Sequence, residues 1–284
     1  MIMRRTVRLA GIVVLAATLA GCSRVGGLFG GDDDEPTLED LTAEQIYSRG
    51  TAELEDGDAE AAAETFDEIE RLYPFSQLAK RAMIMSAYAS YEAGDMASAR
   101  AAARRYLDLY PADEDAAYAQ YLIGLTHYDV IVDIGRDQSS TQEAQEALTT
   151  TVQRYPRSEF ARDAQLKIDL TDDHLAGKEM SVGRYYLKRK HYTAALNRFS
   201  RVIEDYQTTS QTPEALHRMV EANLALGLDD EAFAAATVLG YNFPGSDWYA
   251  RTYKLWTGRE VLPEPDQSGT LSTVYRRVIL GEWL

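Results

Sequence analysis

Cys22 is the only cysteine among the 284 residues of the chain, and it is the clearest candidate for covalent chemistry. A single cysteine cannot form a disulfide within the chain, but its thiolate is a nucleophile that could take up a lipid. Three arginines lie within the first eight residues, and Leu9 to Gly21 carries no charge. A basic start, a short apolar run and small residues are typical of a secretory signal peptide. The run is too short to cross a bilayer, which needs about 20 apolar residues.

The order Leu19-Ala20-Gly21-Cys22 resembles the bacterial lipobox. This resemblance implies that residues 1–21 are removed and that Cys22 becomes an acylated first residue. The alternative is an ordinary signal peptide followed by a chance cysteine. In lipoproteins of this class an aspartate after the cysteine favours the inner membrane, so Ser23 implies the outer membrane. Acyl chains contribute about 0.8 kcal/mol per buried CH₂, which holds a folded domain at a membrane without a membrane-spanning helix.

The other chemically capable side chains form no catalytic or metal-binding pattern. The sequence has neither a G-x-S-x-G elbow nor a phosphate-binding glycine loop. Asp172-Asp173-His174 could bind a cation weakly, although a solvated helix face is the commoner meaning of such a run. The four histidines are scattered: His127, His174, His191 and His217. We therefore expect a binding scaffold rather than an enzyme, with no metal and no cofactor apart from the lipid on Cys22.

The charge balance excludes some partners. The formal charge is −16, and loss of residues 1–21 removes three arginines and no acid, leaving 26 basic against 45 acidic residues, or −19. Nucleic-acid phosphates and anionic lipids would repel such a chain, so we expect no nucleic-acid partner. Residues 22–39 are expected to be the lipidated N-terminus and a flexible linker, because Val25 to Glu35 holds four glycines and four acids.

A helical pattern repeats along the chain with a period of 37 residues. It begins with Tyr47-x-x-Gly50 and closes with Tyr73-Pro74, and it recurs over residues 84–111. The third unit starts in register at Tyr121, but its second half arrives eight residues late, so an insertion lies around Ile131 to Ser140. Two further units follow at residues 183–206 and 220–244.

Each unit has the features of a helix pair. Spacings of 3, 4 and 7 put the marked residues on one helix face, Gly57-Asp58 and Gly94-Asp95 supply turns, and proline after an aromatic residue ends the second helix. The pattern resembles the tetratricopeptide repeat. It predicts an all-α, right-handed solenoid of about five such pairs over residues 40–250. Residues 251–284 would form a C-terminal extension, whose part Leu262–Leu284 we cannot match.

Tyrosines on the expected first helices of units one to three are candidates for a binding groove. A single tyrosine at such a position is more often part of the core. Together they would suit an extended peptide with aromatic side chains, since the first helices of a solenoid line its concave face. The candidates are Tyr47, Tyr88, Tyr91, Tyr121 and Tyr128.

Several stretches are more specific than the repeat and resemble the BamD-type lipoproteins of the β-barrel assembly machinery in Gram-negative bacteria. Residues 238–249 resemble the form found in alphaproteobacteria. The other stretches are Tyr73-Pro74-Phe75-Ser76, Tyr155-Pro156-Arg157-Ser158, Phe160 to Ala164 and Asp172 to Tyr186.

The resemblance implies a function. Units one to three would receive the targeting sequences of unfolded outer-membrane proteins, and units four and five would dock on the POTRA domains of BamA. Arg198, beside Asn197, matches the arginine that makes an ionic contact with BamA in this family. Other Bam lipoproteins would be further partners, on the periplasmic face of the outer membrane. The alternative is a tetratricopeptide lipoprotein that scaffolds peptidoglycan enzymes or envelope-division complexes.

Overall fold

The structure is a computed structural model that describes residues 37–257. The predicted signal peptide, Cys22, most of the linker and the tail Leu262–Leu284 lie outside these residues. The described part of the chain is helical and contains no strand. Its elements are η1 (Leu38–Asp40), α1 (Ala43–Glu55), α2 (Ala59–Leu72), α3 (Gln77–Glu92), α4 (Met96–Leu109), α5 (Ala116–Tyr128), α6 (Ser139–Arg154), α7 (Glu159–Lys188), α8 (Tyr192–Asp205), α9 (Thr212–Leu226), α10 (Asp229–Asn242) and α11 (Asp247–Thr257).

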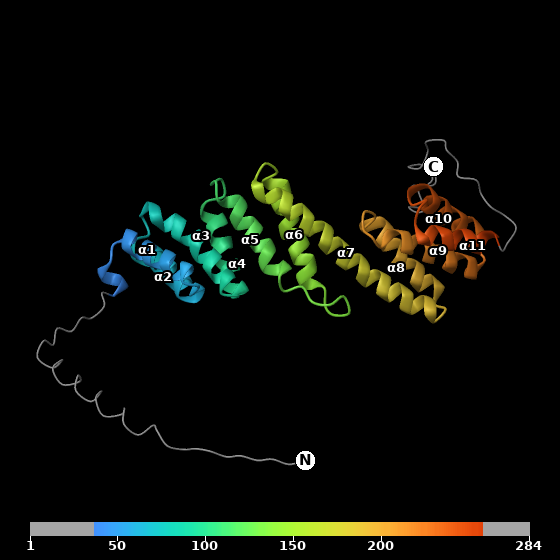
Figure 1. Ribbon diagram of the computed structural model, residues 1–284, viewed down its shortest axis with the longest axis horizontal. Helices are drawn as coiled ribbons and strands as arrows, with labels where there is room; N and C mark the ends of the chain where they lie inside the picture. Colours follow the sequence, from blue (N-terminus) through green and yellow to red (C-terminus); the bar gives the residue numbers. More distant parts are fainter. Residues whose placement is uncertain (1–36, 258–284) are drawn as a thin grey trace, which may run out of the picture. The chain divides into compact units, whose positions relative to one another are not determined.

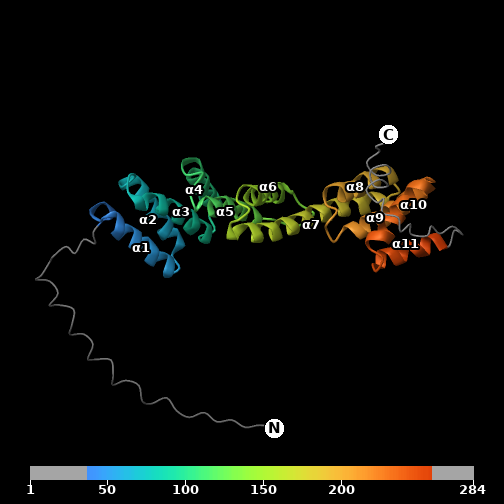
Figure 2. The same cartoon turned by 90° about the horizontal axis from the view of Figure 1, so that it is seen from above.

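Helices α1 to α10 form five consecutive pairs, and each helix packs against the next one in the chain (Figure 1). The odd-numbered helices also contact one another along the first part of the stack, from α1 to α3, α5 and α7. Helix α11 packs on α9 and α10 (Figure 2). This arrangement confirms the predicted fold class of stacked helix pairs, while its handedness stays a prediction. The last helix continues beyond residue 250, to Thr257. The short helix η1 belongs to a separate unit, where Thr37 caps it.

Glycines mark the points where the two helices of a pair cross. A Cβ atom at Gly50 would lie 3.0 Å from the ring of Phe66, and one at Gly183 would lie 2.4 Å from the ring of Phe199. Each glycine precedes its partner by 16 residues. Gly124 meets Leu148 in the same way, at 2.6 Å, but 24 residues later. The extra eight residues are the insertion predicted from the sequence.

The inserted residues form a long connection, 129–138, between α5 and α6. This loop lies against α7. Ile134 is the nearest neighbour of a Cβ built on Gly177, and the Lys178 ammonium donates to the carbonyls of Gly135 and Arg136 at 3.2 and 3.3 Å. The insertion therefore links the third pair to the middle of α7.

The turns within pairs need a left-handed residue. Gly57, Gly94 and Gly227 supply it with φ between 75° and 84°. In the fourth pair Lys190 takes this conformation, with φ of 64°, although it has a Cβ. The fourth pair also has Gln207 in the place where the other units have proline, as the sequence shows, and α8 still ends before Tyr206.

Helix α7 is 30 residues long and was not expected from the repeat pattern. Its first half packs with Tyr121 and Leu148 of the third pair, and its second half begins a separate core cluster at Ala176. Across residues 37–257, no helix is both long enough and apolar enough to cross a membrane. Helix α7 is thus a shared element that completes one helix stack and starts the next.

Candidate functional site

Helices α3, α5 and the first half of α7 bring most of the predicted tyrosines together. Tyr88 and Tyr91 lie on α3, and Tyr118 on α5 lies near both of them. Tyr121 and Tyr128 follow on α5 and share a cluster with Phe160 of α7. We call these six residues the tyrosine face. Sequence reasoning missed Tyr118, and it noted Phe160 only as part of a family-like stretch.

The rings of the tyrosine face contact one another across the helices. The centroid of Phe160 lies 5.2 Å from that of Tyr118 and 5.4 Å from that of Tyr121, and the second pair is stacked. Lys167 lies over the ring of Tyr128, with its ammonium 5.4 Å from the centroid. Such contacts are each worth about 0.5–1.5 kcal/mol. These contacts pack the α5 and α7 parts of the face together, and Tyr88 and Tyr91 of α3 lie beside them near Tyr118.

Carboxylates accept hydrogen bonds from the tyrosine hydroxyls. Tyr91 donates to Asp129, and Tyr121 donates to Asp163. Burial, followed by these hydrogen bonds, raises the pKa of both tyrosines, so both hydroxyls stay protonated at neutral pH. Lys167 donates to Asp163 at 2.8 Å, and this bond and that of Tyr121 lower the pKa of the Asp163 carboxyl.

The five predicted tyrosines differ in their surroundings. Tyr121 is only 9% exposed and packs on Leu148, Ala164 and Ile168, so it supports the face from within the core. Tyr88, Tyr91 and Tyr128 are half-buried. Tyr47 is separate from the face and packs edge-on against Phe66 at 5.3 Å, under the guanidinium of Arg81.

The predicted partner-binding arginine lies on α8. Arg198 donates through Nη1 to both carboxylate oxygens of Glu179 on α7, at 3.1 and 3.4 Å. Arg201 lies 3.5 Å from the same carboxylate. Two cations thus share one glutamate, whose side chain is 17% exposed, and Asn197 beside them is exposed. We call this arrangement the Arg198 triad; it carries a formal charge of +1.

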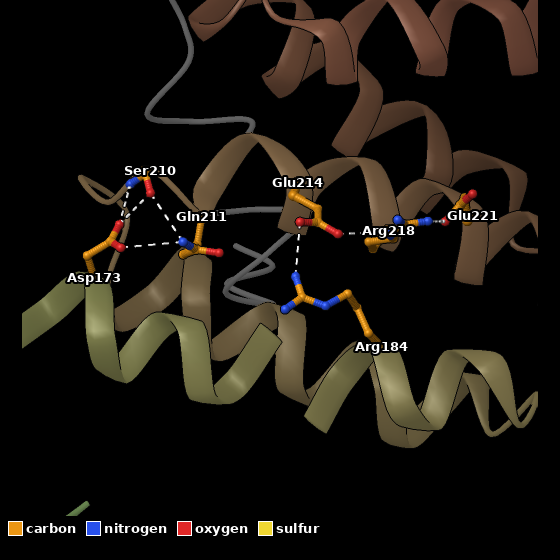
Figure 3. A network of polar contacts seen from close by, with 7 residues as sticks. All are labelled: Asp173, Arg184, Ser210, Gln211, Glu214, Arg218 and Glu221. Atoms are coloured by element: carbon orange, nitrogen blue, oxygen red, sulfur yellow. Dashed lines mark hydrogen bonds and ion pairs between the residues drawn. The ribbon is translucent and has the colours of Figure 1, made fainter. Parts of the chain in front are cut away.

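The acidic pair Asp172-Asp173 is occupied by hydrogen bonds. Gln145 donates to Asp172, while Asp173 accepts from the backbone N–H and hydroxyl of Ser210 at 3.0 and 2.6 Å (Figure 3). Gln211 is a third donor to Asp173, at 3.4 Å. These contacts fasten the start of α9 to α7. Within residues 37–257, no three His, Cys, Asp or Glu side chains come together as a metal site.

Known proteins are similar to this chain in sequence over most of its length. The profile of the YfiO family, described as "Outer membrane lipoprotein", matches residues 39–238. The curated "Outer membrane protein assembly factor BamD" of Caulobacter vibrioides is 44% identical over 271 residues, which cover 94% of this chain and 87% of that protein.

Two other curated proteins of the same name agree with this match. That of Rickettsia prowazekii is 38% identical, with 89% of this chain and 98% of that protein covered. That of Neisseria meningitidis serogroup A is 31% identical, with 85% and 93% covered. The higher identities support the alphaproteobacterial form expected from residues 238–249. The chain therefore belongs to the outer membrane lipoprotein family whose curated members are the BamD outer membrane protein assembly factors.

Proposed function

We propose that the chain is a non-enzymatic assembly factor that presents unfolded outer-membrane proteins to the machinery that inserts them. The curated relatives carry the name of such a factor. The observation that carries the proposal is the tyrosine face, an aromatic surface built by the alternate helices α3, α5 and α7. A lipid on Cys22 would hold the chain at the periplasmic side of the outer membrane.

The tyrosine face suits an extended segment with aromatic side chains. Its hydroxyls at Tyr91 and Tyr121 already donate to carboxylates, so they are not free to bind a client. The ring surfaces of half-buried Tyr88, Tyr91 and Tyr128 remain for aromatic contacts. No sheet edge exists in the part of the chain that the structure describes, so a client would be held by side chains rather than by strand addition.

The Arg198 triad supports a second contact, with the POTRA domains of BamA. Its single excess positive charge would be matched by one carboxylate of the partner, and the side chain of Arg198 is 34% exposed. An arginine fork that is already oriented by Glu179 loses less entropy on binding a carboxylate. In this proposal no bond is made or broken. The chain raises the local concentration of client beside BamA, because tethering makes the second encounter intramolecular.

Copurification from the native envelope tests both contacts. The tagged, full-length lipoprotein would be extracted in mild detergent, and its partners would be quantified by mass spectrometry. We expect a POTRA-containing barrel protein as the dominant partner. Arg198→Glu should reduce its recovery at least five-fold, whereas the same charge reversal at exposed Arg157 should not.

The client contact has its own matched control. Tyr88→Ala with Tyr91→Ala should lower the recovery of unfolded barrel clients at least five-fold. Tyr47→Ala removes a half-buried tyrosine of the same stack but outside the tyrosine face, and should leave client recovery unchanged. Equal loss with Tyr47→Ala would refute the face as the client site. Dominant recovery of cell-wall synthases or hydrolases would replace the proposed function with the peptidoglycan alternative.

A further inference from the structure

We propose that Arg184, Lys188 and Arg218, in a pocket between α7 and α9, form a second site for a carboxylate, carried by an acidic segment of a protein partner. This inference does not depend on the proposed function. It rests on the geometry of a second arginine triad, on the pocket beside it and on the local excess of positive charge.

The second triad has the same composition as the Arg198 triad but lies against α9. Arg184 Nη1 donates to one oxygen of Glu214 at 3.0 Å, and Arg218 Nε donates to the other at 3.2 Å (Figure 3). Arg218 also reaches Glu221 at 2.8 Å. The side chain of Glu214 is 14% exposed. Both guanidinium groups are therefore held in place before any partner arrives.

A pocket of about 470 Å³ opens beside this triad. The cations Arg184, Lys188 and Arg218 line it together with Glu221, and Leu187, Tyr192 and Ala225 add apolar surface. Beside the pocket, the backbones of α7 and α9 approach each other at fewer points than those of α5 and α7. Long polar side chains bridge the two helices there and leave space between them.

The end of α7 is basic in an acidic chain. Residues 184–190 carry four cations and no acid, whereas the whole chain has a formal charge of −16. Cations in the last helical turn are favoured by the helix dipole, which accounts for Lys188 alone. Arg218 lies in the interior of α9, where Glu214, Glu221 and the ring of Trp248 engage its guanidinium. Among residues 37–257, no hydrogen bond or ion pair engages the Lys188 ammonium.

The charges favour a carboxylate over a phosphate. Arg184, Arg218 and Lys188 carry three positive charges against the two negative charges of Glu214 and Glu221, which leaves one net positive charge for the ligand. A carboxylate carries one negative charge and accepts two parallel hydrogen bonds from a guanidinium. The apolar lining would receive an aliphatic or aromatic neighbour in the same segment. By contrast, Asp173 and Ser210 join the same two helices with direct hydrogen bonds, without any unpaired cation, as expected of a purely structural link.

Peptide binding to the full-length protein in detergent tests the site. The probe is a fluorescein-labelled dodecapeptide of alternating glutamate–leucine pairs and Gly-Ser spacers, and its matched control carries glutamine in place of glutamate. Fluorescence anisotropy at about 150 mM salt suppresses long-range attraction. We expect the glutamate peptide to bind at least ten-fold more tightly than the glutamine peptide.

Charge variants locate the binding. Lys188→Glu and Arg184→Gln should each weaken the glutamate peptide at least ten-fold. Lys254→Glu makes the same charge change at an exposed lysine of α11 and should alter the affinity less than two-fold. Lys188 is exposed and unpaired, so Lys188→Glu should lower the unfolding temperature by only about 2–4 °C, through its unfavourable charge at the end of α7, and this small change separates binding from stability.

Three results would overturn the proposal. The first is equal weakening by Lys254→Glu, which would mean diffuse attraction. The second is an unchanged affinity in both pocket variants, which would leave the second triad a structural brace. The third is Lys188-dependent binding to phosphatidylglycerol vesicles without binding of the glutamate peptide, which would make the ligand a lipid headgroup.

Discussion

The tyrosine face and the two arginine triads lie along one succession of helices, and in both regions carboxylates accept hydrogen bonds from neighbouring side chains. On the tyrosine face, Asp129 and Asp163 accept from tyrosine hydroxyls. Around the second half of α7, Glu179 and Glu214 accept from pairs of arginines. The first region therefore presents aromatic rings and acidic groups, and the second presents excess positive charge.

Helix spacing explains this difference. Helices α3, α5 and α7 approach closely, and aromatic rings fill the short distances between them. Helices α7 and α9 approach each other at fewer points; Asp173 contacts the turn before α9, and farther along α7 the long side chain of Arg184 reaches Glu214. The same repeat thus supports two kinds of surface, because a change in spacing selects the side chains that can bridge it.

The variants with the largest expected effect test whether the two helices of a pair cross equally closely in the tyrosine region and in the arginine region. Gly124 belongs to the tyrosine region and Gly183 to the arginine region, and a Cβ at either would overlap its partner at 2.6 or 2.4 Å. We expect Gly124→Ala and Gly183→Ala each to lower the free energy of unfolding by about 1–3 kcal/mol, because overpacking forces side chains to shift. Urea unfolding followed by circular dichroism measures the loss.

Two other glycines test whether the loss of stability follows the distance from the added Cβ to its neighbour. A Cβ at Gly50 would lie 3.0 Å from Phe66, so Gly50→Ala should cost less than either variant. Gly245 has open space around it, and Gly245→Ala should be close to neutral. A cost at Gly245 as large as that at Gly183 would show that the crossing distance is not what matters.

A variant with an intermediate expected effect tests how the free energy of unfolding depends on pH through Asp163. Lys167 and Tyr121 hold the pKa of Asp163 below its ordinary value near 4, so its contribution to stability is present above that value. The contribution is lost as the pH falls through the lowered pKa. Because the carboxylate is half exposed, Asp163→Asn should cost only about 1 kcal/mol at pH 7. That deficit should disappear in urea unfolding at about pH 2 to 3.

Asp108→Asn is the control for this experiment, since Asp108 is exposed and its side chain makes no hydrogen bond within residues 37–257. It should change stability by less than about 0.5 kcal/mol at either pH. If Asp163→Asn lowered the free energy of unfolding by the same amount at pH 7 and at pH 2 to 3, the stability of the tyrosine face would not depend on the ionised carboxylate.

The variants with the smallest expected effects compare the turns within two helix pairs. Lys190 in the arginine region adopts the left-handed conformation that glycine supplies at Gly57 in the first pair. Lys190→Gly removes the strain of a left-handed residue with a Cβ, but glycine also adds entropy to the unfolded chain. The net result should be a rise of about 0.5 kcal/mol in the free energy of unfolding. Gly57→Ala, with nothing near its Cβ, should lower it by about 1 kcal/mol through backbone strain alone. A neutral Gly57→Ala would contradict this account of both turns.

Local patterns were sufficient to predict much of the architecture. The 37-residue period, the glycine turns and the terminal aromatics predicted the five helix pairs, and the late second half of unit three predicted the loop before α6. These features depend on spacings within about 40 residues, which helical geometry translates directly into faces and ends. Cys22, on which the predicted lipid anchor depends, lies outside the described residues and stays a prediction.

Helix α7 shows where local patterns were insufficient. No proline interrupts residues 159–188, and Gly177 and Gly183 lie within the helix, Gly183 in close contact with Phe199, rather than at turns. The repeat pattern suggested separate units, yet one helix serves both neighbouring stacks. A missing turn is harder to recognise than a present one, because the pattern marks where helices end and not where they continue.

The sequence by itself determined the helix pairs, their order, their turns and the side chains available for binding. Only the tertiary structure decided that Tyr121 lies in the core while Tyr91 borders the surface, and that Arg198 and Arg184 each share a glutamate with a second arginine. Tyr121 and Asp163 are 42 residues apart in the chain, and Arg184 and Glu214 are 30 apart. Such pairs depend on the distances between packed helices, and helical periodicity within one segment carries no information about those distances.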